Sequence, residues 1–261
     1  MLMDEKRRGA EYAAKRAQAL RSMERRIQKE LFPKAKLIIA AARKYRRGNK
    51  LYRQEKLLEE AREITKRAAG NIKKYTEAYA FASADFLGTE GKGIASLLSG
   101  KVYGKTIDER MMTYLDNFAE DMVRMVKAGV MMDYKEEQIL SAVRTGYKDP
   151  YRTSVITKAR RKDVNIATPS YGKGVFRNAY RNIVRNSTQV IALAWGLAEE
   201  EYGMEMGAVG FRVYRGSSFP CDQCDHECSY VHKWTDPFPP FHVSCVCYVE
   251  FVFEDDLNSL R

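Results

Sequence analysis

All five cysteines of this 261-residue chain lie between Cys221 and Cys247, and the 220 residues before them contain none. The charged N-terminus is followed by no apolar stretch, so no secretory leader is expected. An odd number of cysteines within so short a span of such a chain makes a poor disulfide framework and favours a metal site. The chain is therefore predicted to end in a small metal-binding module.

The part of the chain before this module is predicted to be helical. It is rich in Ala, Leu, Glu, Lys, Arg and Gln, which are good helix formers. Pro33 is expected to interrupt the first helix, and capping boxes at Thr106–Glu109 and Asp133–Glu136 are expected to open two later ones. The predicted helices cover residues 4–31, 34–47, 51–87, 94–99, 106–127, 133–144 and 174–202, with some helix at 152–162.

The pattern changes after Gly207. Residues 209–214 alternate and are rich in β-branched and aromatic side chains, and residues 246–253 are expected to point their side chains to two faces in turn, which predicts two strands. Residues 221–228 are expected to form a turn-rich loop. The predicted fold is mainly α, with long helices followed by a small C-terminal β/zinc-binding module. Three regions are expected: a basic helical arm over 1–88, a helical domain over 89–205 and the β module over 206–261.

Four of the cysteines and one histidine form two motifs. The first is Cys221-Asp-Gln-Cys224 and the second is His242-Val-Ser-Cys245-Val-Cys247. The two-residue turn of a Cys-x-x-Cys motif brings both sulfurs to one metal ion, and a second ligand pair downstream completes a tetrahedron around Zn²⁺. The zinc is expected to be structural, because its binding energy would hold together a module too small for a core of its own.

The exact ligand set stays open. The candidates are Cys221, Cys224, His242, Cys245 and Cys247. The first two are expected in any metal site, His242 and Cys245 are the first choice to complete it, and Cys247 comes next. Other candidates in the span are His226, Cys228 and His232, of which Cys228 is the expected spare. The alternatives are reduced cysteines without metal, and a catalytic site, which needs an open coordination position or an oriented Cys–His pair.

Positive charge gathers in the N-terminal part of the chain. Residues 1–75 contain 23 Lys and Arg against 9 Asp and Glu, a net charge of +14, whereas the remaining residues sum to −3. Such segregation predicts contact with DNA or an acidic protein surface. The alternative is a solvated helical face, because acidic residues are interleaved throughout. The positions singled out are Arg43, Lys44, Arg46 and Arg47.

A second basic stripe is predicted at the start of the last long helix. Lys173, Arg177, Arg181 and Arg185 follow one another at intervals of four, which places them on one helical face. A row of arginines suits phosphate or carboxylate groups, because the guanidinium fork binds both. The alternatives are a solvated face and pairing with acids elsewhere.

The segment from Phe238 to Cys247 resembles the ending of the phage Mu F-like head morphogenesis family, the phage minor head proteins. That family closes with a Cys-x-x-Cys loop and then a Pro-Pro-x-His-x-x-Cys-x-Cys strand, here Pro239 to Cys247. The resemblance covers residues 130–253, and its specific part is the last 45. The chain departs from the family in having Val243 and Val246, where Pro and Arg are frequent, and in having Cys228.

This resemblance implies a structural protein and not an enzyme. Family members are low-copy proteins of the phage head, so the expected location is the virion, after synthesis in the cytoplasm of a bacterial host. The expected partners are the portal or other head proteins, with double-stranded DNA as a further candidate. No membrane and no small-molecule substrate is expected. The alternatives are a zinc-containing nucleic-acid-binding module and a zinc-dependent nuclease. The nuclease is weakened because all three histidines lie within the zinc module.

Overall fold

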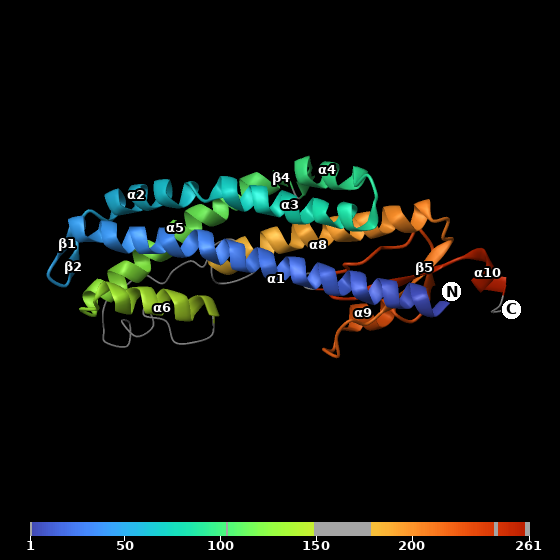
Figure 1. Ribbon diagram of the computed structural model, residues 1–261. Coiled ribbons are helices and arrows are strands. Elements are labelled where there is room, and N and C mark those ends of the chain that lie inside the picture. Colours follow the sequence, from blue (N-terminus) through green and yellow to red (C-terminus); the bar gives the residue numbers. More distant parts are fainter. Residues whose placement is uncertain (1, 103, 149–178, 243–244, 259–261) are drawn as a thin grey trace. The chain divides into compact units, whose positions relative to one another are not determined.

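The computed structural model describes residues 2–102, 104–148, 179–242 and 245–258 (Figure 1). The chain forms two compact units, each built from segments distant in sequence. Unit 1 comprises Met1–Glu24, Tyr75–Lys101 and Ser187–Arg261, and unit 2 comprises Arg25–Lys74 and Val102–Asn186. This division differs from the three consecutive regions expected from the sequence, because the long helices α1, α3 and α8 each contribute residues to both units.

The prediction of a mainly helical chain with a small C-terminal strand region is confirmed. The helices are α1 (Leu2–Ala41), η1 (Ala42–Tyr45), α2 (Gln54–Lys66), α3 (Ala69–Leu87), α4 (Lys92–Ser99), α5 (Ile107–Met131), α6 (Glu136–Lys148), α8 (Ala179–Glu205), α9 (Asp222–Glu227) and α10 (Glu254–Asn258). The strands are β1 (Arg46–Arg47), β2 (Lys50–Leu51), β3 (Lys101–Val102), β4 (Lys105–Thr106), β5 (Gly210–Tyr214), β6 (Val231–His232) and β7 (Tyr248–Val252). The predicted helix over 152–162 lies outside the described residues.

Helix α1 continues through Pro33, so the predicted interruption there is wrong. Proline inside a helix costs about 3 kcal/mol, because it removes a backbone hydrogen bond and crowds the preceding turn. The fully buried side chains of Ile27, Leu31 and Ile38 flank the proline on this helix. Complete burial of such a side chain contributes about 1.5–3 kcal/mol, so these three together outweigh the cost.

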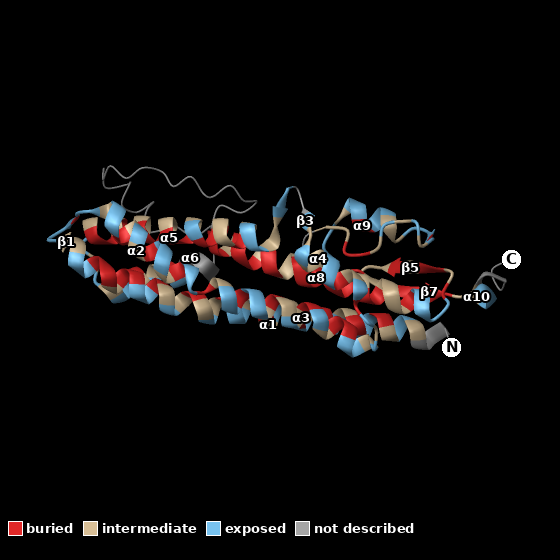
Figure 2. Cartoon of the chain, turned by 90° about the horizontal axis from the view of Figure 1, so that it is seen from above, coloured by how far each residue is buried: buried red, intermediate tan, exposed pale blue. Residues whose placement is uncertain are grey.

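Unit 2 is a helical unit in which α2 packs against α5, and α5 also packs against α6. The buried face of α5 contains Leu115, Phe118, Met122 and Val126, which follow the three-to-four residue spacing of an amphipathic helix (Figure 2). Helix α5 begins as predicted with a capping box: the backbone N–H of Glu109 donates to the Thr106 hydroxyl and its carboxylate accepts from the Thr106 N–H.

Two local predictions in unit 2 are wrong. The helix expected over 51–87 is two helices, because α2 ends at Lys66 and α3 begins at Ala69. The capping box expected at Asp133 and Glu136 does not form. Glu136 instead pairs with Arg43, and Asp133 pairs with Arg46. Asp133 also has a left-handed backbone, with φ of 54°.

Unit 1 combines helices with a three-stranded sheet. A cluster of small and branched side chains packs α3 and α4 against α8, namely Ala80, Ala84, Ile94, Ala194 and Ala198. The sheet has the strand order β6-β5-β7, and both pairings are antiparallel. Its inner residues, among them Phe211 and Phe251, share a core with Cys224, Cys245 and Cys247. The segment predicted as a turn-rich loop contains the short helix α9.

None of the helices that the structure describes is both long and apolar enough to pass through a membrane.

Candidate metal centre

The Cys-x-x-Cys motif is placed by the short helix α9. Cys221 is the N-cap residue of this helix and has an extended backbone, and Cys224 lies on its buried side. The first turn is closed by a hydrogen bond of 2.9 Å from the Asp225 N–H to the Cys221 carbonyl. Asp222 and Asp225 favour a helix start here, because carboxylates are stabilised near helix N-termini. The helix therefore holds both sulfurs close together.

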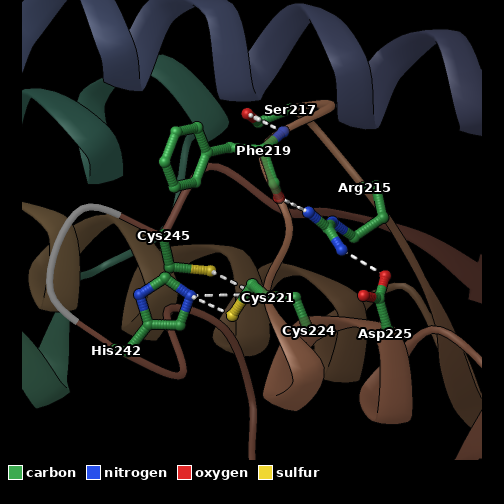
Figure 3. Close-up of polar contacts among 8 residues, drawn as sticks. All are labelled: Arg215, Ser217, Phe219, Cys221, Cys224, Asp225, His242 and Cys245. Atoms are coloured by element: carbon green, nitrogen blue, oxygen red, sulfur yellow. Dashed lines mark hydrogen bonds and ion pairs between the residues drawn. The ribbon is translucent and has the colours of Figure 1, made fainter.

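The second motif reaches the same point from the segment before β7. His242 Nε2 lies 3.3 Å from Cys221 Sγ and 2.9 Å from Cys224 Sγ (Figure 3). Cys245 Sγ lies 4.0 Å from Cys224 Sγ. Ligands around a tetrahedral zinc ion stand about 3.5 Å apart for a sulfur and a nitrogen and about 3.8 Å for two sulfurs, given Zn–S near 2.3 Å. The Cys221–His242 and Cys224–Cys245 separations are close to these values, whereas the Cys224–His242 separation of 2.9 Å is shorter.

All five predicted metal ligands are brought together in two groups that share one residue. The first group is Cys221, Cys224 and His242, and the second is Cys224, Cys245 and Cys247, with the ligand atoms in each group within 4.8 Å of one another. These groups are positioned to hold a metal ion, with Cys224 as the common ligand.

The centre is largely shielded from water. Cys224, Cys245 and Cys247 are only 2–3% exposed, whereas Cys221 and His242 are half-buried. Shielding strengthens electrostatic interactions between the ligands and a bound cation. It also limits the access of solvent to the three buried sulfurs, whereas Cys221 and His242 remain partly accessible.

The thiols influence one another's ionisation strongly. A hydrogen bond from the Cys247 thiol lowers the pKa of Cys245 to about 5, and the same bond raises the pKa of Cys247. Burial raises the pKa of Cys224 to about 12, whereas hydrogen bonding from Cys224 lowers the pKa of Cys221. Of the three buried thiols, only that of Cys245 has a lowered pKa, so the mutual influence of these thiols opposes the ionisation of all three together. A divalent cation would remove this restriction, because metal binding releases thiol protons.

The other candidate ligands belong to neither group, although Cys228 packs against the same core and its thiol interacts with Cys247. Neither ligand group found among the described residues contains Cys228, His226 or His232. His232 is buried and stacked on the Phe211 ring, with ring centroids 4.8 Å apart, and its Nε2 lies 2.7 Å from the Glu227 carbonyl oxygen. This histidine is therefore part of the sheet core. Sequence reasoning placed Cys228 last among the cysteines, which agrees with its position outside both groups.

The segments that carry the ligands are fixed by close packing. A Cβ atom on Gly196 of α8 would lie 2.4 Å from the Pro239 carbonyl oxygen, so only glycine allows α8 to approach the Pro-Pro segment. A Cβ atom on Gly216 would lie 1.9 Å from the Val246 carbonyl oxygen. Arg215 bonds to Asp225 and to the Phe219 carbonyl, which ties the loop before Cys221 to α9 (Figure 3).

Three of the four basic residues predicted near the end of α1 are engaged in ion pairs within unit 2. The pairs are Arg43 with Glu136, Lys44 with Glu60 and Arg46 with Asp133. Arg47 is exposed, with its guanidinium 5.9 Å from the centre of the Tyr52 ring. Three of these residues are therefore paired with acids of the same chain, and they do not need an external partner. Arg47 remains exposed and accessible to one.

The second basic stripe is described only in its last two members. Arg181 and Arg185 on α8 are half-buried, and Arg185 Nη2 lies 3.5 Å from the Tyr114 hydroxyl. Lys173 and Arg177 lie outside the described residues. The described half of the stripe is thus partly buried within the protein, and this contact of Arg185 is with a tyrosine hydroxyl and not with an acid.

Sequence reasoning missed a group of buried polar residues beside the metal centre. Arg8, Tyr12 and Arg16 occupy one face of α1, and Arg16 and Tyr12 are 2% and 0% exposed. Arg8 Nη1 lies 3.5 Å from a carboxylate oxygen of Glu199 on α8. Burial raises the pKa of Glu199 to about 7, because it outweighs the opposing effect of Arg16 and Arg8. The only signal in the sequence was the four-residue spacing of Arg8, Tyr12 and Arg16 within a helix expected to be a solvated arm.

Comparisons with known proteins do not identify a family for this chain, so the sequence motif alone suggests one. No family model, no curated protein and no solved structure matches it.

Proposed function

We propose that the chain is a structural minor head protein of a tailed phage or prophage, with a zinc-stabilised module at its C-terminal end. The observation that carries the proposal is that the side chains of two sequence motifs lie close together in the structure. The Cys221–Cys224 pair and the His242–Cys247 segment resemble the paired closing motifs of phage head morphogenesis proteins, and their side chains meet in one cluster. This proximity supports the interpretation of the two motifs as one metal-binding element.

Zinc is the metal that best fits these ligands. Thiolates with an imidazole favour zinc over magnesium or calcium, which prefer oxygen ligands. Cys221, Cys224, His242 and Cys245 would supply three sulfurs and one nitrogen, and Cys247 is the nearest replacement. Four protein ligands fill a tetrahedron and leave no position open for a substrate water, which is the pattern of structural zinc sites.

The proposed task of the zinc is to hold the module together. It would join α9 to the segment entering β7 in a module whose sheet has only three short strands. Because a site of this kind does not exist in the unfolded chain, the free energy of metal binding becomes free energy of folding. The protein would then act by contacts made with its folded surface.

The proposed partners are the portal or other head proteins, with packaged double-stranded DNA as a further one. The protein would be made in the cytoplasm of the bacterial host and retained in the virion. The long helices of the chain support a role in contact with other proteins, because they have exposed residues along much of their length (Figure 2), many of them charged in α1.

The location of the protein during assembly tests this proposal. A tagged chain should co-purify with head precursors and mature particles, detected by mass spectrometry of the purified particles. Deleting its gene should leave heads that are defective in assembly or in DNA retention. Normal particles formed without the protein, together with its absence from precursors and particles, would overturn the structural role.

A second candidate is a zinc-containing nucleic-acid-binding module that acts outside the particle. The observation in its favour is the basic β1–β2 hairpin of unit 2, where Arg47, Lys50 and Arg53 are all exposed. None of the ion pairs among the described residues involves these three side chains. Binding of the purified chain to duplex DNA should then weaken steeply with salt, because each phosphate contact releases counterions. Reversing the three charges should remove that dependence.

A further inference from the structure

The outer edge of strand β7 faces the first turns of α1. Strand β7 is at one edge of the sheet, with β5 on its other side. A Cβ atom on Gly9 would lie 1.9 Å from the Val249 carbonyl oxygen, so the helix backbone approaches the strand directly. Edge strands present unpaired backbone groups, and covering such an edge with a helix is one way in which proteins protect it.

One residue of α1 reaches the segment that carries the metal ligands. Arg16 Nη2 donates a hydrogen bond to the backbone carbonyl of Cys247, a residue 231 positions away in the sequence. The carbonyl belongs to a candidate ligand and lies two residues after Cys245. Because Arg16 is only 2% exposed, this hydrogen bond is formed away from water. The bond therefore restrains the peptide that presents both sulfurs.

The position of Arg16 is itself fixed by neighbours in unit 1. The Tyr12 hydroxyl donates to the Trp195 carbonyl at 2.7 Å, one helical turn before Arg16. Arg8 lies one turn further back, with its guanidinium 4.4 Å from the centre of the Phe251 ring of β7 and in contact with Glu199. These contacts hold α1 at three successive turns, so Arg16 is presented to Cys247 by a preorganised helix face.

We propose that Arg16 is a positioning residue of the metal centre, and that metal affinity depends on the docking of α1 against β7. Groups that orient metal ligands from outside the first coordination shell typically contribute about 10–100-fold to affinity. The coupling is reciprocal, since a metal that stabilises the Cys245–Cys247 segment must also stabilise the helix docked on it. The inference rests on the metal site of the proposed function and not on the role in the phage head.

Metal affinity of the full-length chain tests the proposal. Zinc would be titrated in competition with a chelating indicator, and cobalt(II) would report tetrahedral thiolate ligation through its absorption spectrum. Arg16→Met should lower the affinity about 10–100-fold without changing the cobalt spectrum of the saturated protein. Arg16→Lys, which keeps a donor and a charge, should lose less. Arg21→Met is the matched control, because Arg21 is exposed on the same helix and in the same unit.

Hydrogen exchange of the unaltered chain provides a measurement that does not depend on a variant folding. Addition of zinc should increase the protection of the amides in residues 8–20. Equal zinc affinity of the Arg16→Met, Arg21→Met and original chains, or unchanged exchange in residues 8–20 when zinc binds, would overturn the coupling alone. Failure of the original chain to bind zinc or cobalt would overturn both the coupling and the proposed zinc site, whereas particle composition decides the head role separately.

Discussion

The two units differ in where they keep their charges. Unit 1 buries Arg16 and Glu199, which are 2% and 1% exposed, in addition to surface pairs such as Arg7 with Glu11. The ion pairs described in unit 2 are all at least partly exposed, as in Lys73 with Asp108, whose side chains are 51% and 55% exposed. A buried charge costs several kcal/mol unless it is well partnered, and a surface pair contributes little. Charged side chains of the same types are therefore expected to affect the free energy of unfolding strongly where they are buried and little where they are exposed.

The units also differ in how their elements approach one another. In unit 1, glycines bring helices against backbone carbonyls, as Gly9 and Gly196 do. In unit 2, the close approach at Gly129 is to the side chain of Ile139, which has rotamers available. A backbone atom cannot move aside as a side chain can. Unit 1 is thus expected to depend on a few exact contacts and on metal, and unit 2 on many distributed ones.

The largest expected effect is the loss of metal from unit 1. Cys224→Ser removes the ligand common to both groups and should release zinc. The apparent binding free energy of structural zinc is about 10–16 kcal/mol in isolated zinc-finger peptides, more than any single side-chain contact provides. Metal analysis and limited proteolysis should show a zinc-free chain cleaved within residues 206–258, with unit 2 intact. Cys228→Ser is the control and should retain zinc. Full zinc content in a Cys221→Ser, Cys224→Ser double variant would contradict the assignment.

The next effect compares two helical glycines. Gly9→Ala places a methyl group against the Val249 carbonyl and should lower the free energy of unfolding by about 1–3 kcal/mol or more, because overpacking forces the backbone to move. Gly70→Ala in unit 2 meets nothing within 4 Å and should instead raise it by about 0.5–1 kcal/mol, since alanine favours helix. Urea unfolding measures both. Similar effects of the same sign would remove the distinction between the units.

The stability of unit 1 should depend on pH because of the buried carboxyl group of Glu199. Its pKa is raised from an ordinary 4.5 to about 7, chiefly by burial. The folded state therefore holds this proton more tightly than the unfolded state, so stability should fall as pH rises from about 4.5 to about 7 and then level off. The fall amounts to roughly 3 kcal/mol.

Glu199→Gln isolates this contribution. The variant should match the original chain near pH 4.5 and exceed its stability above pH 7, with the difference taken at each pH under the same metal conditions. A variant that is less stable than the original chain at pH 8 would show that the arginines, and not burial, dominate the environment of Glu199.

The smallest expected effect belongs to unit 2. Arg43→Ala removes the exposed ion pair with Glu136, and the urea midpoint should stay unchanged, because solvent screens such pairs and their ordering costs side-chain entropy. A shift as large as that of Gly9→Ala would mean that surface charge supports unit 2 in the way that buried charge supports unit 1.

The sequence by itself determined the features that depend on neighbouring residues. The helical composition, the Thr106 capping box and the Cys-x-x-Cys turn are local, so the residues involved need no distant partner to form them. The spacing of the two Cys/His motifs also selected all five members of the metal groups. These predictions succeeded because short-range spacing fixes which side chains share a turn or a face.

Only the tertiary structure decided the roles of Pro33, Asp133 and Arg16. Helix α1 runs through the proline because the residues around it are buried, and Asp133 pairs with Arg46 instead of capping a helix. Arg16 belongs to a segment that composition predicts to be a solvated arm, yet it is buried against Cys247. Each outcome depends on contacts between residues far apart in the chain. The free energy of such contacts exceeds the local conformational preference, and local spacing does not reveal the distant partner.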